Sequence, residues 1–270
     1  MRKINIQVSS GLGDRFLTLL FYCVNFGLEN EINIFWEKNH CLNCNYSKLI
    51  QNKIKISSEF DDFFELPSNI PVTNRKHLIE NYLNNTKQDV LIKGQVFDKT
   101  RDFRKLSYKK YFENFIKPAD EISSVVENYM NNEFNSSVIG VHFRTADKIK
   151  NLFYSNGKSF FQVLQEYERI IDFYIEKDFK ILLATDDSGP KFPFSDKIQD
   201  LKLRDYFKKK YGSKIIEFPC RSFKRNSEEA IIDAFCTLVL LTKCDFFVGS
   251  SVSSFSKLIC SSFDKNFKLI

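Results

Sequence analysis

Apolar and polar positions alternate along the chain in blocks that predict an α/β protein. INIQVSS (4–10) and EINIFWE (31–37) are typical of short strands, and FLTLLFYCVNFGL (16–28) between them is typical of a buried helix. The glycine turn SGLGDRF joins the first strand to this helix. Strand, turn, helix and strand in this order form a βαβ unit with parallel strands. Residues 40–85 are mixed and polar, and DVLIKGQVF (89–97) predicts one more strand.

The alternation is clearer in the second half of the chain. Residues 106–133 predict a helix that Pro118 interrupts. The predicted strands that follow span residues 136–144, 178–187, 213–218 and 245–251, and the predicted helices span residues 159–177, 196–212, 227–244 and 253–263. Such alternation predicts a parallel sheet with helices on both faces. Polar residues around NNEFNSS separate the two halves, so we expect two domains, residues 1–130 and 131–270.

Composition narrows the classes of function. Hydrophobic residues make up 43% of the 270 residues and charged residues 27%, as in soluble globular proteins. The net charge of +6 favours anionic partners such as nucleotides and phosphosugars. The basic residues are scattered and form no stripe interleaved with aromatic side chains, which argues against a nucleic-acid partner.

Targeting signals and cysteines indicate a compartment. The N-terminus lacks the apolar region of a signal peptide, and no run approaches the ~20 apolar residues of a transmembrane helix. The longest run, AIIDAFCTLVLL, contains Asp233 and Thr237 and predicts a buried helix. The seven cysteines are an odd number, and several lie in apolar runs. We therefore expect reduced thiols and a cytoplasmic protein, with peripheral contact to a membrane left open.

One short stretch has the spacing of metal ligands. HCLNC brings His40, Cys41 and Cys44 together. A structural zinc site needs four ligands, and no second pair of this kind occurs elsewhere in the chain. We expect an ordinary loop here and no metal.

Four stretches carry polar or glycine residues at the carboxyl ends of predicted strands, where open α/β sheets bind ligands. The first is GLGD (11–14), in which Gly11 and Gly13 allow close approach of a ligand to the backbone and to a helix N-terminus. A tight turn before a helix explains it equally well. It is neither a dinucleotide fingerprint nor a P-loop, because Phe16 stands where the third glycine would and no G-K-[ST] follows.

The other three stretches lie in the second half. HFRTADK (142–148) ends a strand with Arg144, whose planar fork suits a phosphate; a surface salt-bridge loop is the alternative. ATDDSGP (184–190) could bind a hydroxyl, a base or a metal through its two carboxylates, or form a turn. GSSVSSFSK (249–257) opens a helix with serines that could hold an anion or only cap the helix. Together they indicate a diphosphate-containing ligand along this edge.

These four stretches, in this order, resemble the superfamily that contains the α1,6-fucosyltransferases, the NodZ-type nodulation enzymes and the protein O-fucosyltransferases. GLGDRF is similar to the N-terminal glycine loop, GVHFRTADK to a G-V-H-x-R-x-x-D-K stretch, and LLATDD to a strand that ends in paired aspartates. CDFFVGSSVSSFS is the most specific match. The resemblance covers most of the second half and roughly the first 40 residues, while residues 41–135 align with nothing.

The resemblance implies a GT-B-like α/β fold of two Rossmann-like domains with parallel sheets. It also implies GDP-fucose as donor, a glycan acceptor, inversion at the anomeric carbon and no metal. Arg144 would hold the β-phosphate and stabilise the leaving GDP, and His142 would lie against the nucleotide. The other residues implied in donor binding are Gly11, Gly13, Asp14, Asp186, Asp187, Ser253, Ser254 and Phe255.

Two positions depart from the family pattern. An aspartate that can read guanine is replaced by Thr237, and Asp233, one helical turn earlier, could substitute for it. The glutamate proposed as general base in α1,6-fucosyltransferases is replaced by Leu152. Inversion usually needs a base. The nearby carboxylates are Asp14 and Asp147.

We assign Asp147 and Lys148 to the catalytic group with Arg144, because both match the family stretch. Two alternatives remain open. The same fold could use another nucleotide sugar, which Thr237 allows. The chain could also be a non-catalytic module that binds a nucleotide sugar or glycan, which Leu152 allows and Arg144 argues against.

Overall fold

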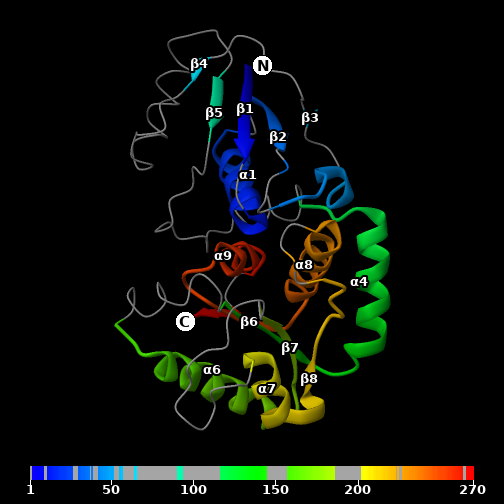
Figure 1. Cartoon of the computed structure of the whole chain (residues 1–270), viewed down its shortest axis with the longest axis vertical. Coiled ribbons are helices and arrows are strands. Elements are labelled where there is room, and N and C mark those ends of the chain that lie inside the picture. The colour runs from blue at the N-terminus through cyan, green and yellow to red at the C-terminus, as the bar shows by residue number, and fades with distance from the viewer. Residues whose placement is uncertain are drawn as a thin grey trace.

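The computed structural model contains two parallel β-sheets with helices packed around and between them (Figure 1). It describes residues 2–8, 11–26, 30–36, 38, 42–51, 55–56, 64–65, 90–93, 116–144, 157–185, 202–222, 224, 227–263 and 266–270. The first sheet has the strand order β3-β2-β1-β5-β4, and the second has the order β10-β9-β6-β7-β8. The predicted α/β fold with two parallel sheets is therefore confirmed.

The first sheet belongs to the N-terminal part of the chain. Its strands are β1 (Arg2–Val8), β2 (Asn30–Trp36), β3 (Lys55–Ile56), β4 (Phe64–Glu65) and β5 (Val90–Lys93). Helix α1 (Leu12–Phe26) connects β1 to β2, which pair in parallel from Arg2 opposite Asn30 to Val8 opposite Trp36. This is the βαβ unit that the sequence predicts. A short 3-10 turn, η1 (Tyr46–Lys48), follows β2.

The second sheet is built from β6 (Val138–Phe143), β7 (Lys180–Thr185), β8 (Ile215–Ile216), β9 (Phe246–Gly249) and β10 (Phe267–Leu269). The helices of this half are α4 (Asp120–Glu133), α6 (Phe160–Ile175), α7 (Leu203–Tyr211), α8 (Glu228–Leu241) and α9 (Ser254–Cys260), with the 3-10 turn η2 (Gly212–Lys214) after α7. The terminal strand β10 was not predicted. It pairs with β9 and extends that edge of the sheet.

Serines set the starts of three helices. Ser159 forms a capping box with Gln162 at the start of α6. Ser227 accepts a hydrogen bond from the Ala230 N–H, and Ser253 from the Ser256 N–H. Each bond satisfies a backbone donor that the first helical turn leaves open. The predicted start of these helices at a serine is confirmed.

Strand β6 lies in the middle of the second sheet, and its side chains divide between the two faces. Ile139, Val141 and Phe143 are buried against the face that α6 and α7 cover. The opposite face of the sheet packs with α8 and α9, which lie between the two sheets (Figure 1). Because successive strand residues point to opposite faces, His142 is directed toward α9.

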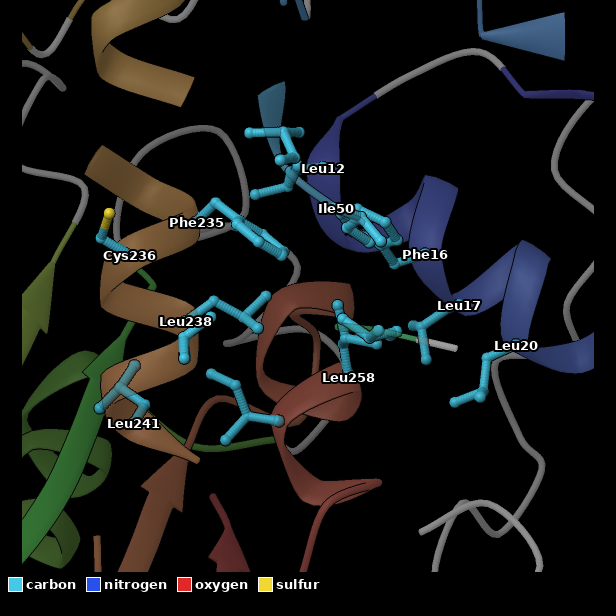
Figure 2. Close-up of a cluster of buried hydrophobic side chains, with 14 of the residues drawn as sticks. Leu12, Phe16, Leu17, Leu20, Ile50, Phe235, Cys236, Leu238, Leu241 and Leu258 are labelled. Atoms are coloured by element: carbon cyan, nitrogen blue, oxygen red, sulfur yellow. The ribbon is translucent and has the colours of Figure 1, made fainter. Parts of the chain in front are cut away.

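A continuous hydrophobic cluster joins the two halves of the chain. Figure 2 shows Leu12, Phe16 and Leu17 of α1 facing side chains of α8 and α9. The Phe16 and Phe235 rings lie 5.4 Å apart between centroids. An ion pair between Lys48 and Glu228 crosses the same boundary. The α8 and α9 helices are therefore shared by the core of both halves.

The expected domain boundary at residue 130 falls within α4, and α4 packs against α8 of the C-terminal half. Within the described part of the chain, no helix has both the length and the apolar character needed to cross a membrane. The six described cysteines carry free thiols.

Candidate functional site

The carboxyl end of β6 brings two of the predicted site residues to the edge of the second sheet. His142 is buried, and its Nδ1 lies 2.7 Å from the Ser256 Oγ on α9. The His142 ring also packs on Phe255, with 4.9 Å between ring centroids. Arg144 follows directly after the strand and is half-buried. The strand end and the start of α9 therefore form one cluster.

Ser256 links the His142 ring to the backbone that follows β9. The Ser256 Oγ accepts the Ser250 N–H at 3.0 Å and lies 2.7 Å from the His142 Nδ1. A serine hydroxyl has one hydrogen and two lone pairs, so it bonds to the ring nitrogen either as donor or as acceptor. In both cases Ser256 holds the ring in place.

A second group of hydrogen bonds holds the backbone around Arg144. The Arg144 N–H donates to the Ser250 Oγ at 2.9 Å. The hydroxyls of Ser250 and Tyr167 lie 3.0 Å apart, and the Tyr167 hydroxyl donates to the His142 carbonyl at 3.2 Å. Burial raises the pKa of the Tyr167 phenol, so it remains a neutral donor. Sequence analysis did not identify Tyr167, which lies within an ordinary amphipathic helix pattern.

The hydrogen bond at the start of α9 caps the helix. Ser253 is buried, and its Oγ caps the helix by accepting the Ser256 N–H at 3.3 Å. Ser254 and Phe255 are half-buried. The alternative interpretation of this stretch, helix capping, thus holds for Ser253, while Phe255 packs on His142.

Three residues of the GLGD stretch belong to helix α1, which begins at Leu12, and only Gly11 precedes the helix. Gly13 lies directly against α9. A Cβ on Gly13 would be 2.5 Å from the Phe255 nitrogen and 2.8 Å from its Cα, so only glycine permits this approach. Gly11 has open space at the corresponding position, and Asp14 is half-buried. At Gly13 the close neighbour of the backbone is therefore helix α9.

Asp233 is buried, and its carboxylate accepts hydrogen bonds from Arg221. Its Oδ1 accepts from the Arg221 Nε at 2.9 Å and Nη2 at 2.7 Å, and its Oδ2 accepts from the Arg221 backbone N–H at 2.7 Å. The hydrogen bond to Asp233 raises the pKa of Arg221. Thr237 donates its hydroxyl to the Asp233 carbonyl at 2.8 Å. The pair ties the segment after β8 to α8.

Four predicted site residues lie outside the described residues: Asp147, Lys148, Asp186 and Asp187. Leu152 and the stretch that contains His40 and Cys41 lie outside them too. Among the residues that the structure describes, no group of three or more His, Cys, Asp or Glu side chains is arranged to hold a metal ion.

Comparison with solved structures finds fucosyltransferases. NodZ from Bradyrhizobium matches with a TM-score of 0.61 and 15% identity, over 96% of this chain and 91% of NodZ. Arabidopsis thaliana FUT1, as a variant in complex with GDP, matches with a TM-score of 0.59 and 11% identity, over 97% of this chain and 68% of FUT1. POFUT1 in complex with GDP-fucose matches with a TM-score of 0.55 and 13% identity, over 97% of this chain and 95% of POFUT1.

The fold is that of these fucosyltransferases. The similarity extends over nearly the whole chain, including the N-terminal half, whose residues 41–135 resemble nothing at the level of sequence. No protein-family model and no curated protein matches the chain. In this fucosyltransferase fold, Gly13, His142 and Phe255 meet at the carboxyl edge of the second sheet.

Proposed function

We propose that the chain is a glycosyltransferase that moves fucose from GDP-fucose to a glycan acceptor, with inversion and without a metal. The observation that carries this proposal is the contact between three separate stretches of the predicted site. His142, beside Arg144, bonds to Ser256 and packs on Phe255, and Phe255 lies against Gly13. The solved structures with the same fold support it, since NodZ was crystallised with GDP and soaked with GDP-fucose.

Arg144 is the proposed cation for the leaving group. When the bond from fucose to GDP breaks, negative charge develops on the β-phosphate oxygen. A guanidinium held at that oxygen stabilises this charge more in the transition state than in the ground state, which is the condition for catalysis. With a protein cation in this role, the proposed reaction would not require a divalent metal. His142 would lie against the nucleotide.

The acceptor proton needs a base, because inversion is a direct displacement by the acceptor hydroxyl. Asp147 is the proposed base, and Lys148 would contact the phosphates. Asp14 is the second carboxylate proposed for this role. Asp186 and Asp187 would line the rim of the donor or acceptor pocket. Gly11, Ser253 and Ser254 would contact the diphosphate.

A second candidate is the same reaction with another nucleotide sugar. It is favoured by Asp233, whose carboxylate oxygens both accept hydrogen bonds from Arg221. An aspartate in this state has less capacity to accept the N1–H and 2-amino hydrogens of guanine. If Asp233 does not read the base, the preference for GDP would have to come from other residues.

The proposal is tested with the purified full chain. Thermal unfolding is measured with GDP, UDP and ADP, and GDP release from GDP-fucose is followed with and without EDTA. We expect stabilisation by GDP and release that EDTA leaves unchanged. No shift with any nucleotide and no release would refute the proposal. A shift with UDP or ADP but not GDP would support the second candidate, and GDP binding without turnover on a panel of glycans would support a binding module.

A further inference from the structure

We propose that Tyr167 and Ser250 are positioning residues for Arg144. Their hydroxyl groups hold the Arg144 backbone where its guanidinium can meet a leaving phosphate. The inference rests on the function proposed for Arg144. Neither residue would contact the donor. Both are fully buried beneath the edge of the sheet and act through the main chain.

The need for such residues follows from the register of the second sheet. β6 pairs with β9 as far as His142 opposite Gly249, where β9 ends. Arg144 therefore lies past the last paired residue on that side. Its N–H is bound instead by a side chain, the Ser250 Oγ at 2.9 Å. On the β9 side of the strand, the position of Arg144 therefore depends on this oxygen, while the ladder with β7 continues as far as Phe143 opposite Thr185.

Ser250 is itself fixed by Tyr167. Its hydroxyl lies 3.0 Å from the Tyr167 hydroxyl, which donates to the His142 carbonyl at 3.2 Å. With the Ser250 hydroxyl donating to Tyr167, every polar hydrogen in the group has an acceptor, and the lone pair that receives the Arg144 N–H remains available. The group thus bonds the main chain on both sides of Phe143, through the His142 carbonyl and the Arg144 N–H.

The Tyr167 ring is held in place by packing in the core. It packs on the Phe143 ring at 4.3 Å between centroids, on the face that α6 covers. Replacing it with phenylalanine removes one oxygen atom and keeps the ring. A fully buried group that loses its partner disturbs its neighbours strongly. Tyr167→Phe therefore isolates the hydrogen bonds from the packing.

We expect Tyr167→Phe to lower kcat by about 10-fold and to leave KM for GDP-fucose within about twofold, because the loss falls on the transition state. Ser250→Ala should lower kcat at least as much, because it removes the acceptor itself. The matched control is Tyr174→Phe on the same helix. That ring packs on Phe179 and Phe246, and kcat should stay at the wild-type value.

A double-mutant cycle separates positioning from a general loss of structure. In an Arg144→Lys background, the flexible ammonium depends less on the backbone position, so Tyr167→Phe should lower kcat less than it does in wild type. Amide exchange at Arg144 should be faster in Tyr167→Phe. An unchanged kcat, or an equal fall in both backgrounds, would overturn this inference alone. A wild-type protein that lacks both turnover and GDP binding would refute the proposed function instead.

Discussion

At the scale of single residues, successive side chains at the end of β6 point alternately into the core and toward the candidate site. Phe143 is buried on the α6 face, while His142 bonds to Ser256 on the other face. The strand and its charged end were predictable from local sequence. The partners were not, because Ser256 lies 114 positions from His142 and Ser250 lies 106 positions from Arg144. Only the folded sheet brings them together.

Arg144 is the residue on which the proposed reaction depends most. Removing one group that stabilises developing charge typically lowers kcat by about 10²–10³-fold. We expect a fall of this order for Arg144→Ala in a GDP-fucose transfer assay. Arg144→Lys should recover only part of the rate, because an ammonium lacks the bidentate fork. The assigned role is wrong if Arg144→Ala turns over at the wild-type rate with unchanged thermal stability.

Asp233 gives a prediction about how the guanine base of the nucleotide is recognised. If its carboxylate remains bound to Arg221 in the complex, it does not contact the 2-amino group of guanine. Inosine diphosphate, which lacks that group, should then bind within about threefold of GDP. Loss of a hydrogen bond to a charged group would instead cost about 1.5–3 kcal/mol, which weakens binding by more than tenfold. Calorimetric titration with both nucleotides measures this. A loss of tenfold or more for inosine diphosphate would show that Asp233, or another acceptor, reads the amino group.

Asp233→Asn tests the same pair without a ligand. The buried carboxylate accepts three hydrogen bonds from a half-exposed arginine, so the substitution should lower the free energy of unfolding by about 1–2 kcal/mol after allowance for solvent screening. Chemical denaturation measures the change. Lys214→Gln is a suitable control, because its partner Asp178 is exposed and the pair should contribute little.

At the scale of elements, the sequence predicted the longer strands and the starts of the three serine-capped helices, and it was least accurate where tertiary contacts determine the structure. The glycine stretch 11–14 was expected to be a turn, yet α1 begins at Leu12. Glycine has a low helix propensity, but the space between α1 and α9 admits nothing larger at Gly13. β10 has three residues and pairs only at an edge, so its local pattern was too short to detect.

The contact at Gly13 predicts a strong effect of a single methyl group. Gly13→Ala would force α1 away from the backbone of Ser254 and Phe255. We expect a loss of about 1–3 kcal/mol in unfolding free energy, as for other overpacked sites, together with weaker GDP binding. Gly11→Ala is the control for stability, since no atom lies within 4 Å of its Cβ position. Equal stability for the two variants would contradict the close contact at Gly13.

At the scale of the whole molecule, the two sheets share one hydrophobic cluster. Phe235 and Leu258, from the C-terminal half, pack with Phe16 and Leu17 from the N-terminal half (Figure 2). Helices α8 and α9 therefore cover the second sheet and contact α1 at once. A site assembled where α1, α9 and β6 meet requires that the halves keep this arrangement. The described halves should consequently unfold together.

The single tryptophan allows this to be measured. Trp36 lies in β2, 5.5 Å from the Phe16 ring, while far-UV circular dichroism reports on both halves. Phe235→Ala in α8 removes a buried ring and should cost about 3–5 kcal/mol. We expect the Trp36 fluorescence and dichroism midpoints to fall by the same amount, and Phe173→Ala, at a side chain that is 50% exposed, to leave both nearly unchanged. If Phe235→Ala shifts dichroism but not Trp36 fluorescence, the halves are energetically separate, and the cluster between them contributes little to the site.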